Sequence, residues 1–305
     1  MAENSSSTTD RARALTARAP AGDAARRALL ATMPVIERRL GLAGIATTVL
    51  EGGNGPPIVL LHGPGAHAAH WMRMIPALVA THHVIAPDLP GHGASAIEAG
   101  RLDVERVLGW LGELLDQTCA APPVLVGQLL GGAIAARFAS RHGARLSRLV
   151  LIDTFGLQPF QPTPEFGRAL NDMLAQPTEQ THDNLWRKCA FDLDALRRSM
   201  GRSWEPFAAY NLDRVSTPAV QAALQALMQH CGPAIEPAEL DRIGVPTTLI
   251  WGRHDLATPL AAAEAASRRY GWPLHVIEKA NDDPPVEQPE AVLSAIHDAI
   301  SEETQ

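Results

Sequence analysis

The sequence predicts an α/β fold with a mostly parallel, doubly wound sheet flanked by helices and interrupted by a helical insertion. Eight short apolar runs, several rich in β-branched residues, alternate with longer stretches of helical pattern. Several runs end in Gly, Asp or His, which is typical of parallel strands buried on both faces. Between Thr154 and Ile243 the strand pattern disappears, and the chain becomes aromatic and helical.

The elements follow in a regular order from Val35 onward. The predicted strands are VIERRL, ATTVLE, PPIVLLHG, HHVIAPDLP, PPVLVGQLLG, LSRLVLIDT, VPTTLIWG and PLHVIEKA. Helices are expected near 69–81, 101–118 and 131–143, between these strands. Four further helical segments make up the insertion: FGRALNDMLAQ, HDNLWRKCAFDLDALRRSM, WEPFAAYNLDRV and PAVQAALQALMQHC.

The pattern divides the chain into three parts. Residues 1–20 are mostly Ser, Thr, Ala and Arg, so we expect a disordered tail. Residues 21–154 and 244–305 are expected to form the α/β core domain, and its Ala-rich start at 21–32 either docks on the domain as a helix or is a targeting remnant. Residues 155–243 are expected to form a helical cap over the carboxyl edge of the sheet, where open α/β folds bind ligands.

Composition excludes several classes of function. With 26 basic and 33 acidic residues, the chain has a net charge of −7 and no broad positive field for nucleic acid or an anionic membrane. No apolar stretch is long enough for a membrane span or a secretory signal, so a cytoplasmic location is expected. The three cysteines indicate neither a disulfide framework nor a metal cluster, so we expect no metal and no cofactor. A small-molecule substrate or ligand is the expected partner, and nothing in the composition favours a monomer over an oligomer.

Four motifs follow strands in a fixed order. They are His62-Gly63-Pro64-Gly65, Asp88-Leu89-Pro90-Gly91-His92-Gly93, Val126-Gly127-Gln128-Leu129-Leu130-Gly131-Gly132 and Trp251-Gly252-Arg253-His254-Asp255. Over residues 35–300 their order and spacing resemble the capped members of the α/β-hydrolase superfamily. The resemblance implies a nucleophile, an acid and a histidine in that chain order.

Three positions depart from the pattern that the resemblance implies. Leu129 stands at the nucleophile position, and Asp282 stands where the histidine belongs. Pro64, which has no N–H, stands at one oxyanion donor position, although a one-residue slip would place Gly65 there. The amide of Leu130 is the other donor, and Asp255 keeps the acid position. The catalytic triad is therefore expected to be degenerate, because leucine cannot form an acyl-enzyme.

The two remaining carboxylates form the predicted catalytic pair. If Asp255 and Asp282 face each other under the cap, with Asp283 adjacent, one of them should hold a proton near neutral pH. Such a pair can shuttle protons or activate water. In the alternative, Asp282 and Asp283 cap the helix that begins near Pro289 or form a solvated turn, and Asp255 is a loop carboxylate bonded to backbone amides.

Other residues are expected to line the pocket. Gln128 lies at the elbow, His70 follows the oxyanion loop, and His254 could replace the missing base from a new direction. Trp186 and Trp204 in the cap form either an aromatic lid or simply core. A cap thiol that reaches the site is a further alternative to ordinary buried cysteines.

Three functions are compatible with this site. The first is an enzyme of the lyase, isomerase, cyclase or C–C bond type acting on a small apolar carbonyl compound, with Asp282 as proton acceptor and Asp255 as its partner. The second is a catalytically inactive, hydrolase-derived ligand-binding protein, a pseudoenzyme in which Leu129 fills the space of the nucleophile. The third is a slow hydrolase that uses carboxylate-activated water.

Overall fold

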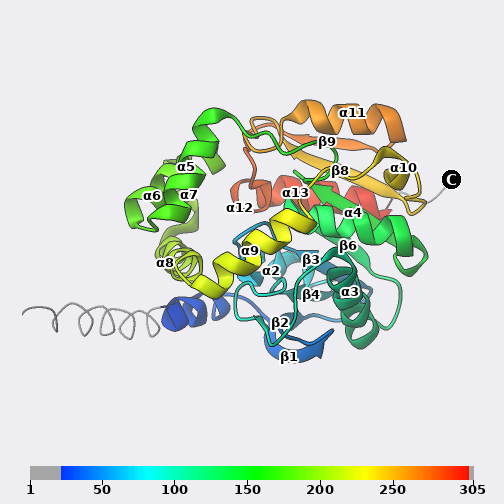
Figure 1. Cartoon of the computed structure of the whole chain (residues 1–305), viewed down its shortest axis with the longest axis horizontal. Coiled ribbons are helices and arrows are strands. Elements are labelled where there is room, and N and C mark those ends of the chain that lie inside the picture. Colours follow the sequence, from blue (N-terminus) through cyan, green and yellow to red (C-terminus); the bar gives the residue numbers. More distant parts are fainter. Residues whose placement is uncertain (1–21, 302–305) are drawn as a thin grey trace, which may run out of the picture.

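The central element is a nine-stranded sheet, seen in a computed structural model that describes residues 22–301 (Figure 1). The path runs β1-β2-β4-β3-β6-β7-β8-β9, and β5 pairs with β2. Strands β3, β4, β6, β7, β8 and β9 are parallel, whereas β1 and β2 are antiparallel to their neighbours. The bounds are β1 Ile36–Leu42, β2 Ile45–Gly52, β3 Pro57–Leu61, β4 His83–Pro87, β5 Ala96–Ile97, β6 Val124–Gln128, β7 Arg148–Ile152, β8 Thr247–Gly252 and β9 Leu274–Ile277. The predicted, mostly parallel sheet is thus confirmed.

The sheet is buried on both faces because helices cover it from each side. Alternate residues of β3 enter different cores: Val59 and Leu61 pack on one face, and Ile58 and Leu60 pack on the other. The first core includes α3 (Val104–Thr118), α4 (Leu130–His142) and α11 (Leu260–Tyr270). The second includes α13 (Pro289–Ser301) and part of the helical segment 22–30. This two-sided burial explains why the central strands appear as continuous apolar runs.

The structure differs from the predicted elements in two places. The expected helix at 69–81 is split into the 3-10 helix η1 (Ala68–Arg73) and the short α2 (Ile75–Leu78). Pro76 lies at the start of α2, and because proline has no N–H it interrupts a continuous α-helix. Strand β5 has two residues, too few to show a pattern. The predicted tail at 1–20 lies outside the described residues.

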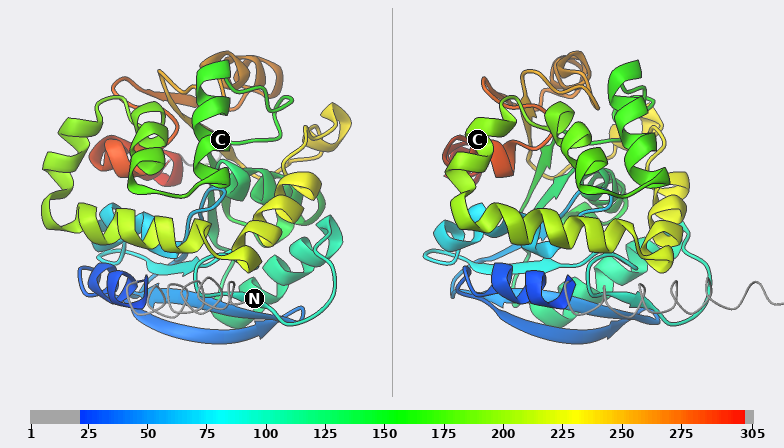
Figure 2. Two further views of the ribbon diagram at one scale, coloured as in Figure 1. Left: turned by 60° about the vertical axis from the view of Figure 1, so that its left-hand side comes forward. Right: turned by 90° about the vertical axis from the view of Figure 1, so that its left-hand side faces the viewer.

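Between β7 and β8 the chain forms six α-helices and no strand that the structure describes. They are α5 (Pro164–Ala175), α6 (Glu179–Cys189), α7 (Leu193–Met200), α8 (Trp204–Val215), α9 (Pro218–His230) and α10 (Pro237–Leu240). Thr163, Thr178 and Asp192 each accept a hydrogen bond from a first-turn N–H, which fixes where three of these helices begin. Figure 2 shows α5–α9 as a green to yellow layer to one side of the sheet.

Among residues 22–301, no helix combines the length and the apolar character needed to cross a membrane.

Candidate active site

The turn between β6 and α4 holds Leu129 in a strained backbone conformation. Its φ of 46° and ψ of −111° lie where a residue with a side chain is rarely found. Gly131 makes this sharp turn possible, because a Cβ there would lie 2.3 Å from the carbonyl oxygen of Leu61. Such strain costs about 1–3 kcal/mol and is common at functional sites. The turn places the unreactive side chain of Leu129 at the position where a nucleophile was expected from the sequence.

The loop after β3 packs against that leucine. A Cβ on Gly63 would lie 3.2 Å from Leu129 Cδ1, so the leucine side chain occupies the space next to the loop. Pro64 and Gly65 follow and line the same cavity. Leu130 begins α4, where N–H groups have no acceptor within the helix, so its amide is the donor available on this side.

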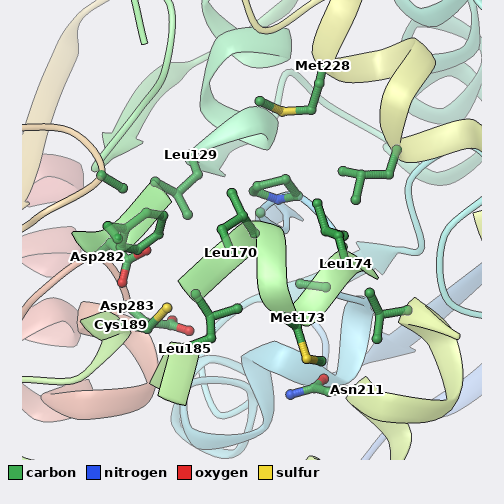
Figure 3. Close-up of a pocket in the computed structure, with 18 of the residues that line it drawn as sticks. Leu129, Leu170, Met173, Leu174, Leu185, Cys189, Asn211, Met228, Asp282 and Asp283 are labelled. Atoms are coloured by element: carbon green, nitrogen blue, oxygen red, sulfur yellow. The ribbon is translucent and has the colours of Figure 1, made fainter. Parts of the chain in front are cut away.

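A cavity of about 500 Å³ extends from this turn to the helices above it. Its size is typical of small-molecule sites. The lining is mostly apolar and comes largely from α5, α6 and α9, as with Leu170, Met173, Leu174, Leu185, Leu224 and Met228. Figure 3 shows Asp282, Asp283 and Cys189 gathered on one wall, and Asn211 away from them.

The loop between β9 and α12 (Pro284–Glu287) supplies the polar wall. Both Asp282 and Asp283 are buried and line the cavity. Asp283 Oδ2 lies 2.7 Å from His70 Nε2, and Asp283 Oδ1 accepts a 2.9 Å hydrogen bond from Gln128 Nε2. Asp282 Oδ1 is buried and has no hydrogen-bond partner within residues 22–301. The predicted pocket residues His70 and Gln128 do line the cavity, and both hold Asp283.

The carboxyl groups differ in how readily they ionise. Burial raises the pKa of Asp282 well above its ordinary value, and the neighbouring carboxyls of Asp255 and Asp283 raise it further. Burial also raises the pKa of Asp255, but hydrogen bonds from Thr258 and Ala257 favour its ionised form and leave it at about 6. Asp282 therefore keeps its proton to a higher pH than an ordinary aspartic acid does.

Asp255 lies behind the cavity wall instead of in it. Its Oδ1 accepts hydrogen bonds from the amides of Ala257 at 2.6 Å and Thr258 at 2.8 Å, and its Oδ2 accepts one from the Thr258 hydroxyl. It is not among the residues that line the cavity. The alternative of a loop carboxylate bonded to backbone amides describes this geometry, although Asp255 is still close enough to act on the pKa of Asp282.

Asp153, the residue after β7, was not among the site residues predicted from the sequence. Asp153 has a φ of 44°, and its Oδ1 accepts a 2.8 Å hydrogen bond from the amide of Gly252. Burial and the neighbouring Asp255 carboxyl raise its pKa well above the ordinary value. Its place at the carboxyl end of a buried strand was the signal that could have found it.

Cys189, the last residue of α6, is a cysteine of the helical segment between β7 and β8 that lines the cavity. Burial is the main cause that raises the pKa of this thiol well above its ordinary value, and the Asp282 and Asp283 carboxyls add to it. Cys189 is therefore a neutral thiol at neutral pH and lacks the thiolate that a nucleophile needs.

Two predicted pocket residues lie elsewhere. His254 is exposed, and its ring lies 4.9 Å from that of Phe191, so it neither lines the cavity nor replaces the base. Trp204 is buried but packs edge-on against Trp186, with ring centroids 5.7 Å apart. Only Trp186 of this pair reaches the cavity, because Trp204 forms the layer behind it.

Metal ligation needs several donor side chains that converge on one point. No group of three or more His, Cys, Asp or Glu side chains in the described part of the chain is placed to hold a metal ion.

Comparison with known sequences gives matches over most of the chain. Residues 58–295 match the profile described as "Alpha/beta hydrolase family". The chain is 30% identical over 261 residues to a pimeloyl-[acyl-carrier protein] methyl ester esterase of Aeromonas hydrophila, covering 83% of this chain and 98% of the relative. It is 26% identical over 238 residues to a 2-hydroxy-6-oxo-6-(2'-aminophenyl)hexa-2,4-dienoic acid hydrolase of Metapseudomonas resinovorans. This match covers 75% of this chain and 78% of the relative.

Solved structures share the fold at lower identity. A bacterial membrane phospholipase A aligns with a TM-score of 0.78 and 24% identity, covering 96% of this chain and 94% of its own. The 2-hydroxy-6-oxo-6-phenylhexa-2,4-dienoate hydrolase of a Rhodococcus species aligns with a TM-score of 0.76 and 24% identity. The alignment covers 88% of this chain and 99% of that hydrolase.

Proposed function

Because this chain belongs to the alpha/beta hydrolase family, whose profile matches residues 58–295, we propose that it is an enzyme with a non-standard active site. It acts on a small, mostly apolar carbonyl compound by carboxylate acid–base chemistry, without an acyl-enzyme. One observation carries the proposal: Asp282, a buried carboxyl with an unpartnered oxygen, lines an apolar cavity that Leu129 also lines.

The proposal excludes a covalent acyl-enzyme for a chemical reason. Leu129 has no lone pair, and the Cys189 thiol holds its proton because of its raised pKa. In a serine hydrolase, loss of a triad member costs about 10⁴ to 10⁶-fold in rate. A reaction in which the enzyme only transfers protons does not need a nucleophilic side chain.

Asp282 is the proton donor in the proposed step, in place of the acceptor role that the sequence suggested. Its raised pKa keeps it protonated, so it transfers that proton to the carbonyl oxygen of the substrate. Asp283, held by His70, takes a proton from the carbon next to the carbonyl, and the product of the step is an enol. The proton count balances, because one proton is given and one is taken. Isomerase, lyase, cyclase and C–C bond reactions can begin with such a step.

Hydrolysis by carboxylate-activated water is a second candidate. The names of the relatives favour it, since they describe an ester hydrolase and a dienoic acid hydrolase. A general base must be ionised, so this activity would rise with pH as Asp282 loses its proton. A ligand-binding role without turnover is a third candidate, supported by the packing of Leu129 against Gly63.

A turnover screen separates the three candidates. The protein and its Asp282→Asn variant are incubated with p-nitrophenyl esters and with ketones and diketones, and products are identified by mass spectrometry. Rearranged or cleaved ketones formed only by the unaltered protein support the proposal. Ester hydrolysis that rises with pH favours the second candidate, and recovery of every compound unchanged favours the third.

A further inference from the structure

The charge distribution around the cavity indicates what kind of molecule it can hold. No Lys or Arg lines the cavity within residues 22–301. The ionisable side chains that do line it are His70, His182, Cys189, Asp282 and Asp283. A bound carboxylate or phosphate would therefore meet the carboxylate of Asp283 and the carboxyl of Asp282, whose raised pKa favours its neutral form, and no lysine or arginine.

The histidines at the cavity do not supply a free cation. Burial lowers the pKa of His182 to about 4, so its ring is neutral at neutral pH. His70 is engaged with Asp283 through Nε2, so any charge on its ring is already matched by a carboxylate. Each ring keeps one nitrogen without a hydrogen-bond partner among the described residues, Nδ1 of His70 and Nε2 of His182, but neither ring supplies an unpaired positive charge to an anionic ligand.

The arginines that stack on the aromatic residues of the cap are also occupied. Arg197 lies over Trp204, whereas Arg26 and Arg214 lie over Tyr210. Each is ion-paired, Arg197 with Asp183, Arg26 with Asp88 and Arg214 with Asp213. Drawing one of them into the cavity would leave a carboxylate without its partner, which is costly.

The remaining polar groups on the lining are uncharged. Asn211, Gln221 and Gln225 carry amide side chains, and the Asn211 carbonyl oxygen lies 3.1 Å from His67 Nε2. Amides can bond to a ketone, ester or hydroxyl group, but they do not neutralise a buried anion.

We propose that this cavity selects an uncharged carbonyl compound and rejects one that carries a carboxylate or a phosphate. This inference rests on the proposed function and narrows its substrate class. It also sets the chain apart from the relative whose name describes a dienoic acid substrate.

Calorimetric titration of the full chain with 2-decanone and with decanoate at pH 7.5 tests the inference. These probes have the same length and differ in charge at the reacting end. We expect 2-decanone to bind at least about tenfold more tightly, which corresponds to about 1.4 kcal/mol. Decanoate binding that equals or exceeds that of 2-decanone would overturn the inference while leaving the proposed chemistry standing.

A variant with an added cation shows whether charge is the cause. Leu170→Arg places a guanidinium on the α5 wall of the cavity, and circular dichroism checks that the variant is folded. We expect decanoate binding to approach that of 2-decanone in this variant, and continued rejection of decanoate by a folded variant would count against the inference. If 2-decanone does not bind the unaltered protein at all, the inference fails, whereas the proposed function is judged by whether the turnover screen finds a transformed ketone. If it binds but no ketone is transformed, only the proposed chemistry fails.

Discussion

Asp283 Oδ2 lies 2.7 Å from His70 Nε2, which joins the loop after β9 to the 3-10 helix after β3 across the polar wall of the cavity. Both side chains are buried, and Gln128 holds the other oxygen of Asp283. A carboxylate with two fixed partners cannot rotate freely. Asp283 is therefore oriented for a role at the ligand, while Asp282 Oδ1 is left without a partner in the described part of the chain.

Removing the histidine should impair catalysis more than binding. In His70→Ala, Asp283 loses the partner that orients it, so we expect kcat to fall about 100-fold with KM within about threefold. Steady-state kinetics on a substrate found in the screen measures both constants. His297→Ala, at an exposed position, is the control. If both variants have the same kcat and KM, His70 has no catalytic role.

Restoring the serine alone should not restore ester hydrolysis. In Leu129→Ser the hydroxyl lacks a histidine base, and the raised pKa of Asp282 makes that carboxyl a poor substitute, so p-nitrophenyl butyrate hydrolysis should stay within about threefold of background. Adding Asp282→His should raise the rate at least about tenfold over the single variant, because a base is then present. Rapid hydrolysis by Leu129→Ser alone would mean that another group already acts as the base.

Stability should depend on pH through Asp282. Its folded pKa lies well above the value of about 4 that it has when unfolded, so the folded state holds an extra proton between the two values. This contribution is complete below pH 4 and is lost as pH rises toward the folded pKa, by about 1.4 kcal/mol per pH unit. Urea unfolding from pH 5 to pH 8 should show a smaller loss of unfolding free energy in Asp282→Asn than in the unaltered protein. The exposed Asp172→Asn should keep the original slope, and parallel slopes in all three proteins would contradict the burial of a proton at Asp282.

The cavity thiol should be unreactive at neutral pH. Because burial and two carboxyls raise its pKa, Cys189 should resist iodoacetamide at pH 7.5, and peptide mass mapping should find it alkylated at least about tenfold more slowly than free cysteine. Cys189→Ala should keep turnover within about threefold. Rapid alkylation, together with loss of turnover in the alanine variant, would identify Cys189 as a nucleophile.

Much of the fold could be predicted because burial on both faces of a parallel sheet leaves long apolar runs in the sequence. The eight predicted strands match β1–β4 and β6–β9, and the helical insertion lies where the strand pattern stops. The split of the helix at Pro76 depends on one residue inside an apolar stretch, and the two-residue β5 is held by pairing with β2, so neither left a periodic signal.

The site was harder to predict, because its contacts join residues far apart in the chain. The elbow and the positions of Asp255 and Asp282 were predicted from motif spacing. Asp153 lies outside these motifs and was not predicted, and a cysteine at the site was only one of two alternatives. His254 was misplaced because adjacent side chains in a loop need not face the same way: Asp255 is buried, whereas His254 is exposed.

Proton exchange at carbon tests the proposed chemistry most directly. The protein, Asp282→Asn and Asp172→Asn are each incubated with 2-decanone in D₂O, and nuclear magnetic resonance follows loss of the protons next to the carbonyl. If Asp282 donates to the carbonyl oxygen, the unaltered protein and Asp172→Asn should exchange these protons at least about 100-fold faster than Asp282→Asn. Equal exchange rates in all three samples would contradict carboxylate acid–base chemistry at this site.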